Sequence, residues 1–163
     1  MDSTGQLTDT GTAGVMVRPP LLFLGGVLLG FALDHLLALQ FPLARIDLIH
    51  RVVAGCLILF GIAVFAASVR NFAHAATPVP GTKPTRVLVT TGIHGWSRNP
   101  IYLGMLLVYC GIGTAVRSPS ILILTLPLAI IIRYGVVARE EAYLERRFGD
   151  AYRAYKDRVR RWF

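Results

Sequence analysis

Four long apolar runs constrain this sequence more than any other feature. They cover residues 21–39, 52–69, 101–116 and 120–138, and the last of them is interrupted only by Arg133. A helix that crosses the hydrocarbon core of a bilayer needs about 20 apolar residues, within a range of roughly 17–25. The first, second and fourth runs reach this length, and the run over residues 101–116 is shorter. The sequence therefore predicts an all-α polytopic membrane protein with about four transmembrane helices, the last two forming a tight hairpin.

The low content of charge supports the assignment to a membrane. Only 16% of the 163 residues are charged, whereas soluble domains carry about 25%. The length predicts one membrane domain, over residues 19–163. We expect a disordered polar tail over residues 1–18 before it, and a charged, amphipathic helical tail over residues 139–163 at its end.

The basic residues indicate which face of the membrane the loops occupy. The formal net charge of +8 could suggest a nucleic-acid partner. Eight of the 17 Lys and Arg residues follow the last apolar run directly, however, which favours anionic lipid headgroups and no nucleic acid. With four spans, the loop over residues 70–98 and the tail share one side, and the other side holds only Arg45, Arg51 and Arg117. This excess predicts that loop and tail are cytoplasmic, at an inner or plasma membrane.

A few polar residues in the apolar runs suggest other functions. Cys56 and Cys110 lie in different runs and the four histidines form no closely spaced pair, so we predict no disulfide framework and no protein-bound metal. Asp34 lies near the end of the first run, where an ionisable residue is either an interfacial structural group or a functional one. A small four-helix exporter that uses Asp34 is therefore an alternative function, although it would need neither the long basic loop nor the charged tail.

The end of the long loop carries chemistry suited to a cofactor. Gly92 allows a tight bend, and Pro100 suits the first turn of the third helix. A helix start attracts anions through its free N–H groups, and Arg98 adds a bidentate donor for a carboxylate. Tyr102 adds a ring face that can contact a cation. Together these groups suit a zwitterion, and S-adenosylmethionine is one compatible zwitterion among others.

The tail combines two carboxylates with an apolar stripe. Glu140 and Glu141 are candidate proton acceptors for an amine substrate, and a solvated surface pair is the plain alternative. Apolar residues recur at spacings of three and four, which predicts a helix face docked on the membrane surface or the spans. Gly149 and Asp150 are expected to divide the tail into two helices, with Asp150 as a cap. The stripe consists of Leu144, Phe148, Tyr152, Tyr155, Val159 and Trp162.

Two linked motifs resemble one enzyme family. The run Ser97-Arg98-Asn99-Pro100-Ile101-Tyr102-Leu103-Gly104 resembles the R-[HN]-P-x-Y-x-G signature of the isoprenylcysteine carboxyl methyltransferase and phospholipid methyltransferase superfamily of integral-membrane enzymes. The tail, from Glu140-Glu141 through Phe148-Gly149 to Tyr152 and Tyr155, resembles the E-E-x-x-L-x-x-x-F-G-x-x-Y-x-x-Y ending of that family. The likeness covers roughly half of the chain, from about Thr77 to its last residue.

The resemblance implies a cofactor and a set of residues that contact it. The cofactor would be S-adenosyl-L-methionine, and Glu140 would contact it from the tail. An arginine near the end of the last span is implied on the substrate side, and Arg139 and Arg133 both match that position. His94 stands where the family usually has Tyr or Phe. The remaining implied cofactor contacts are Arg86, Val87, Leu88, Val89, His94, Asn99, Pro100, Ile101 and Tyr102.

We therefore expect methyl transfer from S-adenosylmethionine to a lipophilic acceptor embedded in the membrane, at its cytoplasmic face. The acceptor could be a phospholipid amine or the thiol or carboxyl of a prenyl-like compound, and the motifs do not distinguish these. Besides the exporter, a catalytically inactive binding module of the same fold is an alternative. The expected partners are the lipophilic substrate and membrane lipids, with the oligomeric state open.

Overall fold

The computed structural model describes residues 18–39, 47–79 and 83–162, and all regular structure within them is helical. The predicted N-terminal tail therefore lies almost wholly outside the described residues. The elements in chain order are α1 (Pro19–Leu36), α2 (Asp47–His74), the 3₁₀ turn η1 (Gly92–Gly95), α3 (Pro100–Ala115), α4 (Pro119–Ile131), the π-helical segment η2 (Ile132–Val137), α5 (Ala138–Phe148) and α6 (Asp150–Arg158).

Three of the described helical stretches are long and apolar enough to cross a membrane. They are Pro19–Leu36, Leu48–His74 and Pro119–Phe148, and the apolar helix α3 is shorter, with 16 residues. These helices confirm the predicted all-α polytopic membrane fold. The second helix extends beyond its apolar run at both ends, and the fourth continues through η2 into the tail helix α5.

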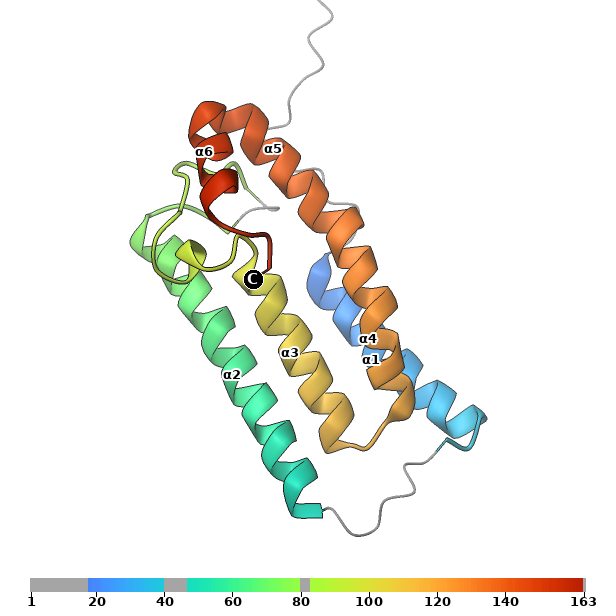
Figure 1. The fold of residues 1–163 in the computed structure, drawn as a ribbon. Helices are drawn as coiled ribbons and strands as arrows, with labels where there is room; N and C mark the ends of the chain where they lie inside the picture. The colour runs from blue at the N-terminus through green and yellow to red at the C-terminus, as the bar shows by residue number, and fades with distance from the viewer. Residues whose placement is uncertain (1–17, 40–46, 80–82, 163) are drawn as a thin grey trace, which may run out of the picture.

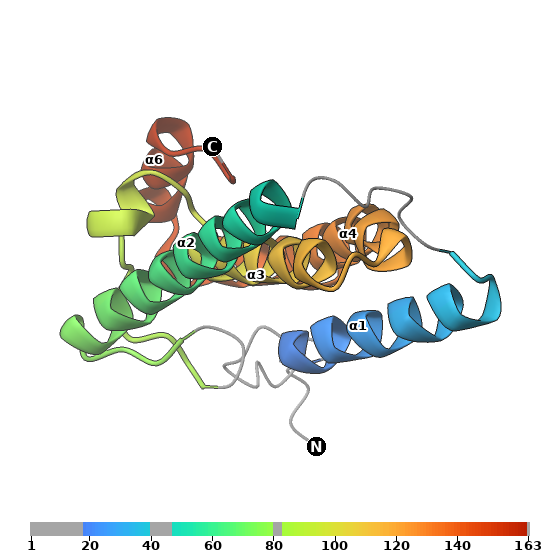
Figure 2. The same cartoon turned by 90° about the horizontal axis from the view of Figure 1, so that it is seen from below.

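The helices form a bundle in which α3 is central. The helix α2 packs along α3, whereas α1 packs mainly against α4. The helices α4 and α5 form one long rod through η2, and α6 folds back over the start of α3 (Figure 1). Seen from the end of the bundle, α1 is set apart from α2 (Figure 2). The described parts of the long loop and the tail gather at the end of the bundle where α2 finishes and α3 begins (Figure 1).

The opposite end of the bundle is fastened by Asp34. The Ser118 hydroxyl donates a hydrogen bond to one carboxylate oxygen of Asp34, and the Ser120 backbone N–H donates to the other at 3.1 Å. Ser118 also caps α4, since its hydroxyl accepts from the Ile121 N–H at 3.0 Å. Asp34 thus joins α1 to the predicted tight hairpin between α3 and α4. This use matches the structural role expected for an interfacial carboxylate.

Two glycines bring α2 and α3 into close contact. A Cβ atom added to Gly61 would lie 2.7 Å from the carbonyl oxygen of Gly104. Small residues at such crossings let the backbones of membrane helices approach and pack. The contact holds the second half of α2 beside the start of α3.

The tail packs on the long loop and, through Trp162, on the spans. Tyr152, Tyr155 and Val159 are buried and pack with Leu88 of the loop, and Trp162 packs against the core of the spans. The predicted break at Gly149 is present, with a φ of 52° that an L-residue rarely adopts. The predicted cap is wrong, because Gly149 occupies the N-cap of α6. Asp150 lies in the first turn and pairs with Arg153 at 2.7 Å.

Candidate functional site

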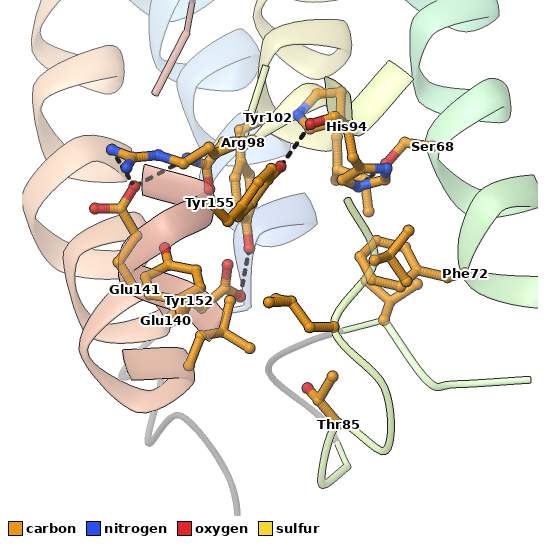
Figure 3. Close-up of a pocket in the computed structure, with 17 residues that line it drawn as sticks. Ser68, Phe72, Thr85, His94, Arg98, Tyr102, Glu140, Glu141, Tyr152 and Tyr155 are labelled. Atoms are coloured by element: carbon orange, nitrogen blue, oxygen red, sulfur yellow. Dashed lines mark hydrogen bonds and ion pairs between the residues drawn. The ribbon is translucent and has the colours of Figure 1, made fainter. Parts of the chain in front are cut away.

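A cavity lies where the end of α2, the loop, the start of α3 and the tail helices meet (Figure 3). It holds about 590 Å³ of space not filled by protein atoms, part of which is continuous with solvent. Side chains from segments up to 87 residues apart, from Ser68 to Tyr155, line it. The fold therefore brings together side chains that are too far apart in the sequence for a local motif to connect them.

The cavity contains a buried tyrosine–carboxylate pair. The Tyr102 hydroxyl donates a 2.7 Å hydrogen bond to the Glu140 carboxylate (Figure 3). Tyr102 is 7% exposed and Glu140 is 5% exposed. A carboxylate buried to this extent with one neutral partner is poised to take up a proton or to attract a cation. Within the described part of the chain, the neutral Tyr102 hydroxyl is the hydrogen-bond partner of Glu140, whereas its neighbour Glu141 forms ion pairs with two arginines.

Glu141 is surrounded by cationic and amide donors. Arg161 donates to it from Nε at 3.0 Å and from Nη2 at 2.6 Å, and Arg98 lies 3.3 Å away. The Asn99 amide donates to the same carboxylate at 3.4 Å. Because a buried carboxylate is costly unless it is paired, this cluster holds the end of the chain against the start of α3.

The chain after α6 forms a strap over the start of α3. The Arg98 N–H donates to the Arg160 carbonyl at 3.0 Å, and the Asn99 side chain donates to the Arg161 carbonyl at 3.3 Å. The Ser97 hydroxyl donates to the same carbonyl at 3.2 Å. These contacts and the ion pair between Arg161 and Glu141 close one side of the cavity.

Two polar atoms of the cavity lining have no partner within the described part of the chain. They are the hydroxyl of Thr85, a residue only 1% exposed, and Nε of Arg98, whose side chain is 8% exposed. Buried polar groups are nearly always hydrogen-bonded, so each exception calls for an explanation. Two unpartnered donors in one cavity are explained by a ligand that carries hydrogen-bond acceptors.

His94 anchors the loop to α2. The Asn71 amide nitrogen can only donate, so His94 Nδ1 accepts from it at 3.4 Å and Nε2 donates to the Ser68 hydroxyl at 3.2 Å. The Phe72 ring packs edge-on against the imidazole, and the Tyr155 hydroxyl donates to the His94 carbonyl at 2.6 Å. Burial lowers the pKa of His94 to about 4, so the ring is neutral near pH 7.

The structure brings most of the predicted site residues to this cavity. Four do not line it: Arg86, Val87, Gly92 and Arg139 are all exposed, and Gly92 begins η1 beside Asn71. Arg133 lies outside it as well, stacked over the Tyr134 ring at 4.9 Å. The predicted residues that line the cavity are Leu88, Val89, His94, Arg98, Asn99, Pro100, Ile101, Tyr102, Glu140 and Glu141.

Several lining residues were not predicted. Ser68 lies at the end of the second apolar run and Phe72 just after it, where the only signal was the pair of polar residues Ser68 and Asn71, spaced by three. Thr85 had no signal in the sequence. Tyr152 and Tyr155 were predicted only as members of a packing stripe, whereas they both pack and line the cavity.

Comparison with known families identifies the protein family to which this chain belongs. The sequence profile of the family described as phospholipid methyltransferase matches residues 49–151, which is 103 of the 163 residues. The chain belongs to the phospholipid methyltransferase family. The match extends from the start of α2 into the first turn of α6, and so includes both halves of the cavity. Membership places the protein among integral-membrane methyltransferases.

Two individual proteins are similar to the chain, and one of them is a methyltransferase. The chain is 32% identical over 118 residues to protein-S-isoprenylcysteine O-methyltransferase of Saccharomyces cerevisiae, covering 66% of this chain and 46% of the yeast protein. It is 39% identical over 66 residues to an uncharacterized protein of Haemophilus influenzae, covering 38% of this chain and 98% of that protein. The chain thus spans about half of the yeast enzyme. No solved structure matches the chain.

Proposed function

We propose that this member of the phospholipid methyltransferase family transfers a methyl group from S-adenosylmethionine to a lipophilic acceptor held in the membrane. The proposal rests on one observation above all: Tyr102, Glu140 and the unpartnered donors of Thr85 and Arg98 share one cavity. The family indicates methyl transfer as the class of reaction, and the cavity contains groups whose charges complement those of S-adenosylmethionine.

The chemistry of the cavity fits S-adenosylmethionine. When bound, this cofactor would supply an activated methyl group on a sulfonium. Its carboxylate would find the free donor of Arg98 near the start of α3, where the helix dipole also favours an anion, and the free hydroxyl of Thr85 at the other end of the cavity could bond a different part of the cofactor (Figure 3). Its cationic groups would lie close to Glu140 and the ring of Tyr102. The apolar lining, such as Leu88 and Leu144, suits an adenine ring.

The two adjacent glutamates are assigned different roles. Glu141 already accepts from Arg98, Asn99 and Arg161, so we assign it to holding the strap in place. Glu140 accepts a hydrogen bond from the neutral Tyr102 hydroxyl and pairs with no arginine as Glu141 does among the described residues, so we assign it to accepting a proton from an amine acceptor. A thiolate or carboxylate acceptor would need no such base. Proximity and alignment in the cavity would supply the larger part of the catalysis.

We propose that the cavity faces the cytoplasm. The loop over residues 70–98 and the tail carry most of the basic residues, and such regions stay on the cytoplasmic side of membranes. S-adenosylmethionine is made in the cytoplasm, so this orientation would give it direct access. Arg139 and Arg133, outside the cavity lining, both stay candidates for contact with the headgroup of the acceptor.

The experiment compares cofactor binding and methyl transfer in the purified protein. Glu140→Gln is expected to lower the transfer of labelled methyl to membrane lipid at least 100-fold, because the carboxylate is lost while the hydrogen-bonding shape is kept. Glu145→Gln on the same helix is the matched control, since Glu145 pairs with Lys156 outside the cavity, at 2.9 Å. Calorimetry in detergent measures binding of S-adenosylmethionine to each variant.

Wild-type protein that binds no cofactor, or that binds it as tightly after Arg98→Ala and Glu140→Ala together, would contradict the proposed site. Cofactor binding without any methyl transfer to extracted lipids would favour the inactive binding module. Proton-dependent efflux would favour the exporter, although both carboxylate oxygens of Asp34 are already occupied by Ser118 and Ser120.

A further inference from the structure

Glu141 receives more positive charge than one carboxylate can neutralise. Arg161 donates to both of its oxygens, from Nε at 3.0 Å to each of them and from Nη2 at 2.6 Å to one. Arg98 approaches the same carboxylate with its Nη2 atom, at 3.3 Å (Figure 3). Two guanidinium groups and one carboxylate leave these three side chains with one surplus positive charge.

The two arginines of this cluster lie in different places relative to the cavity. Arg98 and Glu141 belong to the cavity lining. Arg161 lies outside the lining, in the strap that follows α6, and its side chain is 28% exposed. Arg161 therefore acts on a ligand in the cavity through Glu141 and Arg98, and not by direct contact.

The protein uses only part of the guanidinium group of Arg98. A guanidinium group carries five N–H donors. Nη1 donates to the carbonyl of Lys156 at 3.4 Å, Nη2 contacts Glu141, and Nε has no partner within the described residues. Because Arg161 already donates to both oxygens of Glu141, Arg98 is not drawn into a bidentate pair with that carboxylate.

The backbone of the strap is attached independently of the Arg161 side chain. The Arg161 carbonyl accepts from the Ser97 hydroxyl at 3.2 Å and from the Asn99 amide at 3.3 Å. The next residue, Trp162, packs against the core of the spans. A substitution at position 161 therefore removes the guanidinium charge and leaves these attachments of the strap in place.

We infer that Arg161 is a positioning residue: by pairing with Glu141, it keeps Arg98 available to the carboxylate of a ligand in the cavity. This inference rests on the proposed function, because the carboxylate is that of S-adenosylmethionine. Without the Arg161 charge, Glu141 and Arg98 would form a bidentate pair with no surplus charge. A ligand carboxylate would then meet the negative charge of Glu141 without the compensating charge of the strap.

The test compares two ligands that differ in one carboxylate, by calorimetry in detergent. They are S-adenosylmethionine and its decarboxylated analogue, in which a hydrogen atom replaces the carboxylate. Wild-type protein is expected to bind S-adenosylmethionine roughly tenfold more tightly or better, as a hydrogen bond to a charged group would give. In Arg161→Gln this preference should fall to roughly twofold or less, while the affinity for the analogue should stay within about threefold of wild type.

Arg158→Gln is the control for net charge. It removes the same charge from the exposed end of α6, where Nε of Arg158 donates to the Ala154 carbonyl at 3.2 Å. The preference for the ligand with the carboxylate should be unchanged in this variant.

Two further variants separate the effect of charge from an effect on structure. Arg161→Lys keeps a positive charge beside Glu141 and should retain most of the preference. The double variant Arg161→Gln, Glu141→Gln removes the competing carboxylate as well, so Arg98 should regain the ligand and the preference should return. A variant with fewer ion pairs would not regain the preference if Arg161 were only a structural residue.

Equal weakening of both ligands in Arg161→Gln would show a structural role alone and would overturn the inference. An unchanged preference in Arg161→Gln, or no recovery of it in the double variant, would overturn it as well while leaving the proposed function intact. Wild-type protein that binds neither ligand, or binds both equally, would contradict the proposed cofactor site itself, and the inference with it.

Discussion

Two adjacent carboxylates of the cavity have different surroundings, and the roles proposed for them follow from this difference. Glu140 and Glu141 are adjacent and both are buried, at 5% and 6% exposure. Two arginines and an amide surround Glu141, whereas Glu140 accepts from the Tyr102 hydroxyl. A carboxylate in an ion pair holds segments of the fold together. A carboxylate with one neutral partner can still accept a proton or bind a cation.

His94 is expected to make folding sensitive to acid. Burial lowers its pKa from 6.5 to about 4 in the folded state. The unfolded chain therefore binds a proton that the folded chain does not, and stability is fully present above pH 6.5 and lost as pH falls from there towards 4. A shift of this size corresponds to about 3 kcal/mol at most. Thermal unfolding in detergent between pH 7.5 and pH 4.5 measures the loss.

Carboxylates also titrate at low pH, so the comparison needs variants. His94→Gln should be less stable at pH 7.5 but should lose less on acidification than wild type. The exposed residue His74 provides the control, because His74→Gln should leave the pH dependence unchanged. An identical pH dependence in wild type and His94→Gln would show that another group is responsible.

At the scale of elements, the contact between α2 and α3 holds the site together. Gly61→Ala is expected to lower stability by about 1–3 kcal/mol, because the new methyl group would lie 2.7 Å from the Gly104 carbonyl oxygen. Cofactor affinity should fall as well, since Ser68 and Tyr102 would move apart. Gly55→Ala on the same helix is the matched control, since a Cβ atom there meets nothing within 4 Å. Equal unfolding temperatures for the two variants would contradict this account.

The π-helical segment η2 is the second element that positions the site. A π turn adds a residue to the helical repeat and is frequent at functional sites. Within it, Ile132, Val136 and Val137 are buried, and the rod then continues to Glu140 and Glu141. A regular helix through residues 132–137 would turn the two carboxylates to a different face.

At the scale of the whole molecule, orientation in the membrane decides which compartment supplies the cofactor. With Cys56 and Cys110 replaced by alanine, a single cysteine at position 83 should be labelled by an impermeant thiol reagent only after the membrane is opened. A single cysteine at position 117, in the exposed turn between α3 and α4, should be labelled in intact cells. The opposite labelling pattern would place the cavity on the outer face and would contradict its proposed use of cytoplasmic S-adenosylmethionine.

The amino-acid sequence by itself determined the class of fold and the family. Long apolar runs have one stable solution in a bilayer, because every backbone polar group must be satisfied within a helix. The motifs at Arg98–Tyr102 and Glu140–Tyr155 were likewise readable, because they are local in the chain.

Only the tertiary structure decided which of the motif residues meet. In it, Tyr102 forms a hydrogen bond with Glu140, 38 positions away, and Glu141 forms ion pairs with Arg98 and Arg161. It added Ser68 and Thr85 to the cavity and left Arg86 and Arg139 outside it. The physical reason is that a helix face is set by periodicity along the chain, whereas the partner that covers this face is set by packing between distant segments.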